Sequence, residues 1–170
     1  MKISVARLDR PVAGIHSIDA AATDGGVCRI ALCRQPVMPP DWSTVFGGDR
    51  IVRGSALLDQ LFAELREYFL GLRFRFTIPI DVAQTGTAFQ RRVWKALEGI
   101  PFGETRSYAD IARALRKSQA ARAIGQANGR NPVPIVVPCH RVIAAGGKLG
   151  GFTGGIELKR VLLRIEGHDF

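Results

Sequence analysis

The sequence predicts an α+β protein in two parts. A small N-terminal α/β domain, with a short antiparallel sheet and a helix, should be followed by a mainly helical C-terminal domain with a helix-turn-helix. Three observations support this prediction. Residues 26–33 alternate as a strand does, residues 55–72 repeat large apolar side chains at helical spacing, and helix-capping signals recur beyond residue 84. We expect one domain over residues 1–83 and the other over 84–170.

The first part contains one clear strand and one clear helix. The segment GGVCRIALC, residues 25–33, follows a Gly-Gly turn and predicts a strand, whereas residues 35–50 are rich in Pro and Gly and predict a loop. RFRFTIPIDV, residues 73–82, predicts another short strand. The helix should begin near Ser55 and bury one face, made of Leu57, Leu58, Leu61, Phe62, Leu65 and Phe69. Nothing in this part indicates chemistry.

The second part opens with three predicted helices. Thr87 and Gln90 form a capping box, after which one apolar face continues through Phe89, Val93, Trp94, Leu97 and Ile100. Ser107 and Asp110 give a second cap signal for a helix over residues 107–117. After a short break, residues 120–129 predict a third helix.

The last two of these helices are joined by a short turn, which is typical of a helix-turn-helix but also of ordinary helical hairpins. Charge favours the first interpretation. Residues 84–170 hold 14 Lys and Arg against 6 Asp and Glu, whereas residues 1–83 hold 10 against 9. A polyanionic partner such as nucleic acid would dock on the C-terminal part, although a basic surface that only maintains solubility would look the same.

The third helix is made mostly of small residues and carries one strong cation, Arg122. Small side chains such as Ala121 and Gly125 would let its backbone approach DNA closely, and a lone arginine could enter the base stack. The same small residues could equally pack the helix against its neighbour.

Composition also limits the compartment. No apolar run approaches the roughly 20 residues that span a bilayer, and charges interrupt the N-terminal segment too early for a secretory signal. Three cysteines are too few and too scattered for a disulfide framework. We expect a cytoplasmic protein, associated with the nucleoid if the source is bacterial.

The segment NPVPIVVPCHRV, residues 131–142, holds Cys139 behind three prolines. The prolines remove backbone donors and fix φ, so the segment suits neither a helix nor a central strand. Cys139 could be a core residue, a metal ligand or a nucleophile. A metal site lacks further ligands nearby. A nucleophile needs a base, and His140 could reach the thiol only through a turned backbone or a bridging water.

Two features lie downstream of Cys139. Residues 142–155 are rich in glycine and predict a hairpin followed by a loop. Residues 156–167 predict a final helix that ends near Glu166, whose carboxylate could orient His140 as a third catalytic group.

The C-terminal part resembles the O6-alkylguanine-DNA alkyltransferases, also called methylated-DNA–protein-cysteine methyltransferases. The resemblance rests on GTAFQRRVWKALEGIPFGETRSYADIA, ARAIGQANGRNPVPIVVPCHRVI and GGFTGG…LKRVLLRIEG, and it covers most of residues 86–167. It implies a repair protein that flips O6-alkylguanine out of duplex DNA and transfers the alkyl group irreversibly to its own cysteine, once. A non-catalytic alkyltransferase-like protein, another helix-turn-helix DNA-binding protein and a cysteine hydrolase are the alternatives.

The resemblance assigns catalytic roles by position. Cys139 would accept the alkyl group, His140 would deprotonate it through a water, and Glu166 would hold the imidazole. Tyr108 would help to rotate the nucleotide and donate a proton to the departing base. Asn131 would tie the recognition helix to the active-site segment.

It also implies contacts to DNA and to the base. Arg122 would fill the gap left by the extruded guanine. The remaining implied contacts are made by Ala121, Gly125, Val142, Phe152, Thr153 and Lys159. Many relatives have tyrosine and serine where this chain has Phe152 and Thr153, a change that should alter the range of alkyl groups accepted.

The expected partner is double-stranded DNA containing O6-alkylguanine, bound by a monomer. We expect no cofactor, no nucleotide and no membrane partner. We also expect no metal, because Cys28, Cys33 and His16 lack convincing ligand spacing.

Overall fold

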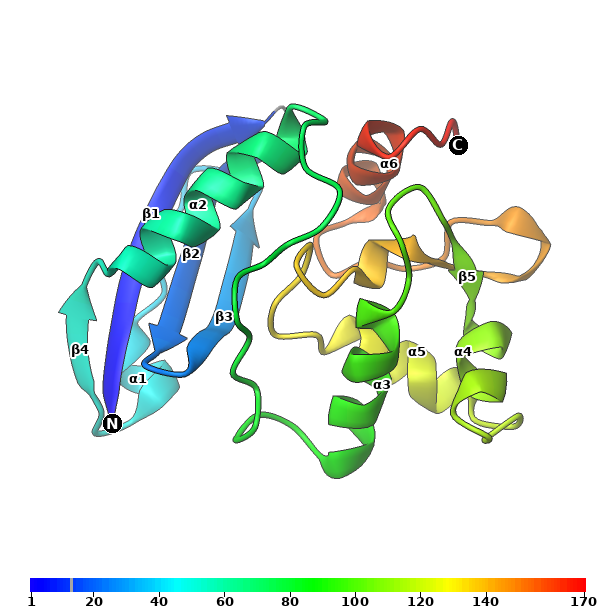
Figure 1. Ribbon diagram of the computed structural model, residues 1–170, viewed down its shortest axis with the longest axis horizontal. Helices are drawn as coiled ribbons and strands as arrows, with labels where there is room; N and C mark the ends of the chain where they lie inside the picture. Colours follow the sequence, from blue (N-terminus) through cyan, green and yellow to red (C-terminus); the bar gives the residue numbers. More distant parts are fainter. Residues whose placement is uncertain (13) are drawn as a thin grey trace. The chain divides into compact units, whose positions relative to one another are not determined.

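The computed structural model describes residues 1–12 and 14–170, and they form two compact units, Met1–Gln84 and Thr85–Phe170. Figure 1 shows a sheet covered by one long helix in the first unit and a set of shorter helices in the second. The α+β class predicted from the sequence is therefore confirmed. None of the helices formed by the described residues is long and apolar enough to cross a membrane.

A four-stranded sheet forms the first unit. Its strands are β1 (Lys2–Val12), β2 (Ile15–Thr23), β3 (Gly26–Cys33) and β4 (Arg50–Arg53), in the order β3-β2-β1-β4. The first three pair antiparallel, as predicted, but β4 adds to β1 in parallel. Strand β2 is almost entirely buried, so its sequence, IHSIDAAAT, lacks the alternation that identified β3.

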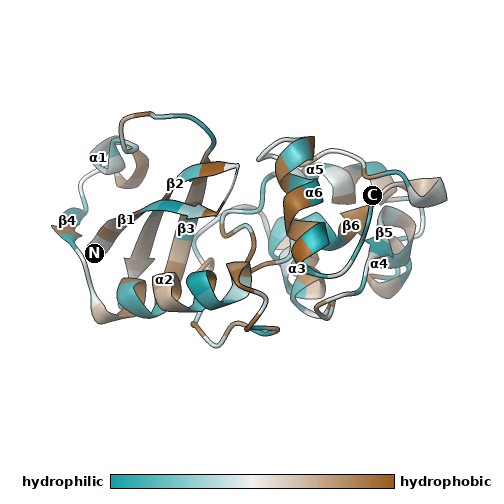
Figure 2. Ribbon diagram, turned by 90° about the horizontal axis from the view of Figure 1, so that it is seen from above, coloured by the Kyte–Doolittle hydropathy of each residue, from teal (hydrophilic) through white to brown (hydrophobic). Residues whose placement is uncertain are grey.

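Helix α2 (Ala56–Phe69) packs against strands β1 to β3 of this sheet. Ser55 caps it, because its hydroxyl accepts the Leu58 N–H at 3.3 Å. The predicted apolar face is buried apart from Leu57, which is half-buried. Figure 2 shows hydrophilic and hydrophobic segments alternating along the helix, as expected for one that covers a sheet.

Two sequence predictions in this unit are wrong. Residues 35–50 are not wholly a loop, since Trp42–Phe46 forms the short helix α1, where buried Trp42 stacks on Phe46 with ring centroids 5.9 Å apart. Residues 73–82 form no strand, and their one sheet-like pairing is an isolated bridge between Val27 and Ile80.

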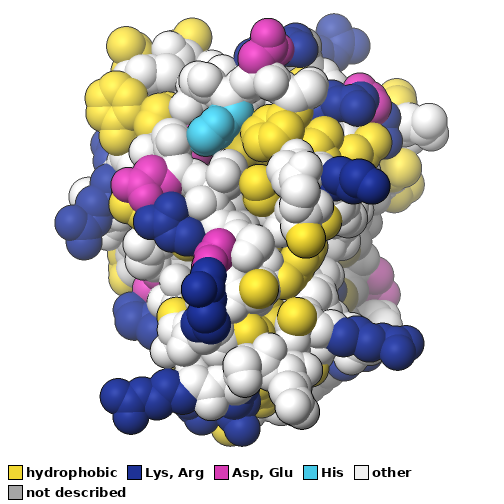
Figure 3. Space-filling view, turned by 90° about the vertical axis from the view of Figure 1, so that its right-hand side faces the viewer, with side chains coloured by type: hydrophobic (Ala, Val, Ile, Leu, Met, Phe, Trp, Pro, Cys, Tyr) yellow, Lys and Arg dark blue, Asp and Glu magenta, His cyan; other side chains and the backbone are white. Residues whose placement is uncertain are grey.

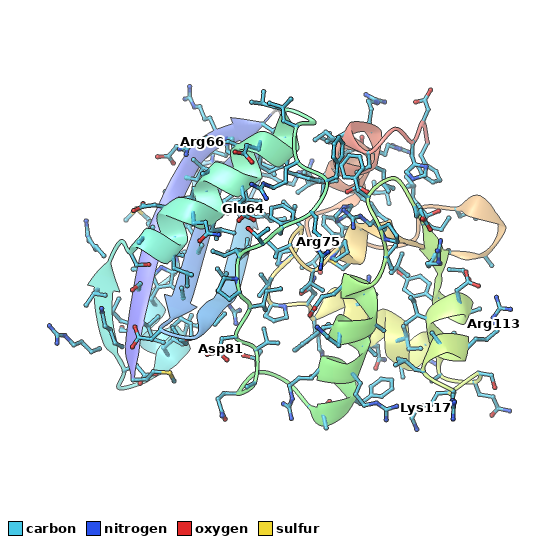
Figure 4. All side chains as sticks on the ribbon, in the orientation of Figure 1. Glu64, Arg66, Arg75, Asp81, Arg113 and Lys117 are labelled. Carbon is cyan, nitrogen blue, oxygen red and sulfur yellow. The ribbon has the colours of Figure 1, made fainter. Side chains whose placement is uncertain are left out.

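Glu64 on α2 explains why residues 73–82 are not a strand. Its buried carboxylate accepts the Thr77 N–H at 2.8 Å and the Thr77 hydroxyl at 2.5 Å. Pro79 has no N–H to donate to a ladder. The segment is therefore tied to a helix side chain, and Glu64 and Arg75, which sits on this segment, are labelled in Figure 4.

The second unit is built from α3 (Ala88–Glu98), α4 (Tyr108–Ala114), α5 (Ala121–Gly129) and α6 (Ile156–Ile165). The predicted capping box at Thr87 is present, and the predicted cap at Ser107 is also a capping box. The Gln90 N–H donates to the Thr87 hydroxyl at 3.2 Å, and the Asp110 N–H donates to the Ser107 hydroxyl at 3.1 Å. Helices α4 and α5 pack together as the predicted helix-turn-helix pair.

The predicted hairpin over residues 142–155 is wrong. Strand β6 (Val142–Ile143) pairs in parallel with β5 (Arg106–Ser107), which lies far from it in sequence. A short 3-10 turn, η2 (Ala145–Gly147), follows, and the Ala144 N–H closes it on the Lys148 carbonyl at 2.7 Å. The glycines here serve a tight loop beside a long-range pairing.

Candidate functional site

The segment before Cys139 is held by its own side chain and backbone hydrogen bonds. The Asn131 side chain accepts the Val133 N–H at 3.0 Å and donates to the Val137 carbonyl at 2.8 Å. The Cys139 N–H also donates to the Val137 carbonyl, at 2.8 Å, across Pro138 with φ −80° and ψ 61°, the geometry of an inverse γ-turn. The prolines and Asn131 therefore give Cys139 a fixed position.

Ile135 adds strain to this segment. It is fully buried, and its φ is 76°. A β-branched residue rarely adopts the left-handed region, which costs roughly 1–2 kcal/mol. The surrounding segment must therefore enforce this conformation.

Cys139 begins a 3-10 turn, η1 (Cys139–Arg141), and is 2% exposed. Burial raises the pKa of its thiol to about 11. The Asn131 side chain, the Lys159 charge and backbone amides including that of Ile135 act in the opposite direction, but burial prevails. The sulfur is a thiol at neutral pH, and it becomes a nucleophile only when a base removes its proton.

His140, the predicted base, follows Cys139 directly in the chain. The 3-10 turn supplies the turned backbone that sequence reasoning required, and it buries His140 completely. His140 Nε2 lies 2.8 Å from Glu166 Oε1, at the end of α6. Burial lowers the pKa of His140, and the Glu166 carboxylate offsets this only in part, so the imidazole is neutral at neutral pH.

Glu166 is held by a second residue that the sequence did not suggest, Arg141. The Arg141 Nε donates to Glu166 Oε2 at 2.8 Å and its Nη2 to Oε1 at 3.0 Å, while Nη1 donates to the Ile100 carbonyl at 2.5 Å. Burial would raise the pKa of Glu166, but its bonds to His140 and Arg141 lower it to about 2. Arg141 directly follows His140 in the sequence, but no sequence pattern indicated that Glu166 would be buried and would need a countercharge.

Lys159 ties the downstream loop to α6. It is fully buried, and its Nζ donates to the carbonyls of Val142 at 2.6 Å, of Gly151 at 3.4 Å and of Leu149. Burial lowers its pKa to about 8, while the nearby Cys139 acts to raise it. The Val142 N–H donates to the Cys139 carbonyl, so both backbone polar groups of Val142 are engaged.

Tyr108 is the first residue of α4 and is half-buried. A methyl group placed on Gly125 would lie 3.7 Å from its ring, and one placed on Gly150 would lie 3.5 Å from it. Burial, and secondarily the charge of Cys139, raises the pKa of the Tyr108 hydroxyl. The ring therefore sits between α5 and the glycine loop, within electrostatic range of the sulfur, and keeps its proton.

Helix α5 is joined to the sulfur site by Asn128, which sequence reasoning missed. Its buried amide donates to the Cys139 carbonyl at 3.4 Å. Trp94 Nε1 donates to the Ala127 carbonyl at 2.8 Å, and the Thr153 hydroxyl donates to the Gly129 carbonyl at 2.8 Å. Three contacts therefore hold the last turn of α5.

The opposite end of α5 carries Arg122, which is exposed, on its first turn. Among the described residues it makes no hydrogen bond or ion pair. Ala121 and Gly125 are half-buried, and Phe152 is half-buried on the glycine loop. Figure 3 shows Lys and Arg side chains distributed around the face that carries this unit.

The structure thus gathers the predicted residues into two groups. Buried Cys139, His140, Glu166 and Lys159 form one cluster with half-buried Asn131, and Tyr108 lies at its edge. Arg122, Ala121, Phe152 and Thr153 lie on α5 and the adjoining loop, outside the cluster. Within the described ranges, no group of three or more His, Cys, Asp or Glu side chains could hold a metal ion, and Cys28, Cys33 and Cys139 are free thiols.

Comparison with known proteins identifies relatives over the same region. A family model described as "6-O-methylguanine DNA methyltransferase, DNA binding domain" matches residues 88–168. A methylated-DNA–protein-cysteine methyltransferase of Mycobacterium bovis is 54% identical over 112 residues, which cover 66% of this chain and 64% of the relative. A methylated-DNA–protein-cysteine methyltransferase of Methanosarcina acetivorans is 44% identical over 119 residues, which cover 70% of this chain and 75% of the relative.

The fold has solved counterparts. The crystal structure of Mycobacterium tuberculosis OGT in complex with DNA matches with a TM-score of 0.78 and 38% identity, covering 98% of this chain and 92% of that chain. The sequence match to the M. bovis protein nevertheless spans somewhat less than two thirds of that relative's length.

Proposed function

The chain belongs to the methylated-DNA–protein-cysteine methyltransferase family, and we propose that it repairs DNA by transferring the alkyl group of O6-alkylguanine to its own Cys139. The observation that carries this proposal is the buried cluster in which Cys139 adjoins His140, itself 2.8 Å from Glu166. Its link to a DNA-facing helix through Asn128 gives a reason for placing a reactive sulfur beside a helix-turn-helix.

The reaction is a displacement at carbon. The Cys139 sulfur attacks the alkyl carbon, the bond from that carbon to guanine O6 breaks, and a thioether forms. Overall the thiol loses one proton and the guanine gains one: His140 takes the first, Tyr108 gives the second, and return of the proton from the imidazolium through solvent restores both residues. No residue of the site offers a way to break a thioether, so each molecule reacts once.

His140 acts as the base. Because its Nε2 is bonded to Glu166, the neutral imidazole uses Nδ1 as its acceptor nitrogen, and we assign to it the removal of the Cys139 proton through a bridging water. The lowered pKa of His140 supports this role, since the imidazole is neutral before the reaction. Glu166, ionised at neutral pH, then stabilises the imidazolium.

Tyr108 supplies the proton at the other end of the displacement. A hydroxyl whose pKa is raised remains a donor at neutral pH, and its position at the edge of the cluster suits a guanine that is losing its alkyl group. Asn131 and Lys159 favour the thiolate electrostatically, because both lower the pKa of Cys139.

The base must leave the helix before it can react, because guanine O6 lies inside duplex DNA. We assign docking to α5, whose Ala121 and Gly125 present little bulk, and we assign to Arg122 the filling of the vacated position in the base stack. Phe152, Thr153 and the backbone at Val142 would line the pocket for the flipped base.

We further propose that Thr85–Phe170 carries both DNA binding and transfer, that Met1–Gln84 has a structural role, and that one chain suffices, since every residue of the cluster comes from one unit. A cytoplasmic, nucleoid-associated location suits a protein that must keep Cys139 reduced.

The test is direct. The protein is incubated with duplex DNA carrying one O6-methylguanine, and each cysteine peptide is then examined by mass spectrometry. One methyl group should appear on Cys139, in stoichiometric and not catalytic amount. Cys28→Ser and Cys33→Ser should leave the transfer intact, whereas Cys139→Ser should abolish it. Binding of the damaged duplex without methyl transfer would instead identify a non-catalytic DNA-binding protein.

A further inference from the structure

The turn between α4 and α5 contains a residue in an unfavourable backbone conformation. Arg116 has φ 54°, and among the described residues only Arg10 and Ile135 are other non-glycine residues with positive φ. Arg116 also explains why α4 ends at Ala114 although the sequence pattern continued to residue 117. A left-handed residue cannot continue a right-handed helix.

Arg116 occupies a position where glycine is usual. Its N–H donates to the Arg113 carbonyl at 2.9 Å, and the Lys117 N–H donates to the Ala112 carbonyl at 2.9 Å. These two bonds define a Schellman motif with Arg116 as the left-handed residue just beyond the helix. Glycine would adopt this conformation freely, whereas a residue with a Cβ pays roughly 1–2 kcal/mol.

The Arg116 side chain does not recover this cost inside the protein. It is exposed, and among the described residues it has no hydrogen bond or ion pair. Arg113 and Arg106 differ from it, because Arg113 pairs with Asp110 and Arg106 pairs with Glu104. Attraction to the carboxyl end of α4 is a weak substitute, since the guanidinium donates to none of that helix's carbonyls.

The position of Arg116 in the fold indicates which kind of partner its side chain could contact. It lies in the turn of the helix-turn-helix, next to Lys117 and ahead of the helix that begins at Ala121. Figure 4 shows Arg113 and Lys117 projecting away from the ribbon at this end of α4. In helix-turn-helix proteins the elements before the recognition helix run along the DNA backbone, where phosphates are the available partners.

We propose that Arg116 contacts a backbone phosphate of the bound duplex, and that its strained backbone is retained for this contact. The proposal rests on the DNA partner of the proposed function, but it does not depend on alkyl transfer. Arg116 is a positioning residue, because it fixes how the protein sits on DNA and touches no reacting atom.

Arg116→Gly separates backbone strain from phosphate contact, because the variant should raise thermal stability and lower the affinity for DNA. Loss of strain should raise the melting temperature by roughly 2–8 °C. Loss of one phosphate contact should weaken binding roughly 3- to 30-fold, equally on undamaged and O6-methylguanine duplexes. The slope of log affinity against log salt concentration should fall by about 1.

Two variants act as controls. Arg116→Lys keeps the charge and the strain, so it should bind DNA nearly as tightly as the parent chain without melting higher. Arg66→Ala removes a positive charge from α2, a helix of the first unit labelled in Figure 4, and should leave the salt slope unchanged.

Affinity is measured by fluorescence anisotropy on a duplex at several salt concentrations, and stability by circular dichroism. An Arg116→Gly protein that melts higher and binds as tightly as the parent would overturn the proposal. Failure of the proposed function would look different. Cys139 would stay unmethylated in every variant, while the affinity series would still report on Arg116.

Discussion

At the Cys139 sulfur, burial and local charge act in opposite directions. Burial holds the thiol pKa near 11, although an amide side chain, a lysine and backbone amides all favour the thiolate. A permanently ionised sulfur would react with any electrophile, whereas a buried thiol becomes reactive only when a base removes its proton. At the scale of single residues, the proposed mechanism therefore makes reactivity depend on the neutral His140 that follows Cys139 and on the Glu166–Arg141 pair that holds the imidazole.

In the proposed mechanism, the pH dependence of methyl transfer follows from the protonation of His140. Its folded pKa lies below the ordinary 6.5 because burial disfavours the imidazolium. The base is lost only when pH falls through that lowered value, so the single-turnover rate should be flat around pH 7 and should decline at some pH below 6.5. Quenched time courses of methyl transfer from a methylated duplex, recorded at a series of pH values, measure this rate. A loss of rate centred above pH 6.5 would contradict the prediction.

Tyr108→Phe tests the proton donor. The variant keeps a ring between Gly125 and Gly150 but loses the hydroxyl. Transfer should slow roughly a hundredfold, because a positioned general acid contributes about that much. Affinity for an undamaged duplex should change little. Equal rates for the parent and the variant would remove Tyr108 from the mechanism.

At the scale of elements, α5 connects the proposed DNA-docking surface with the Cys139 site. Its first turn carries exposed Arg122, and its last turn is bonded to Trp94, Thr153 and, through Asn128, to Cys139. If α5 docks on DNA as proposed, a helix held at one end and exposed along one face would couple its position on the duplex to the Cys139 sulfur. The small residues of α5 therefore matter in two ways: they determine how the helix packs in the protein and, in the proposed function, how closely it approaches DNA.

Two glycine substitutions should have opposite effects on stability. Gly125→Ala places a methyl group 3.7 Å from the Tyr108 ring, an ordinary contact inside a helix, so the free energy of unfolding should rise by about 0.5–1 kcal/mol. Gly86→Ala imposes φ +66° on alanine and brings its methyl group to 2.6 Å from Trp94, so it should cost more than about 2 kcal/mol. Urea unfolding measures both, and equal effects would refute this account.

At the scale of the whole molecule, buried charges make stability depend on pH. Glu166 has a pKa of about 2 in the folded state against an ordinary 4.5. A carboxylate whose pKa is lower in the folded than in the unfolded state stabilises the fold at pH values above its unfolded-state pKa. That contribution is lost as pH falls from about 5 towards 2. Its size is up to about 3 kcal/mol.

Glu166→Gln should therefore be markedly less stable than the parent at pH 7, and the difference should shrink at pH 3. Urea unfolding at the two pH values measures it. Glu157→Gln on the same helix is the control, because that carboxylate is exposed and paired with Arg160 at the surface. A Glu166→Gln deficit that is the same at both pH values would contradict the linkage.

Much of the fold and of the site could be predicted from short-range patterns. Both capping boxes join residues three apart, and the apolar face of α2 repeats every three or four residues. Each pattern therefore depends on residues that are close together in the sequence. The segment that holds Cys139 is also local, since its prolines and Asn131 act within a few residues.

What the sequence by itself determined is therefore a helix-turn-helix beside a stiffened cysteine segment. Only the tertiary structure decided that Arg141 neutralises Glu166, that Lys159 is buried on three carbonyls, that β6 pairs with β5, and that residues 73–82 bind Glu64 and form no strand. These contacts join residues far apart in the chain. Their partners are selected by burial, which obliges every enclosed charge and backbone group to find a partner and leaves no periodic trace in the sequence.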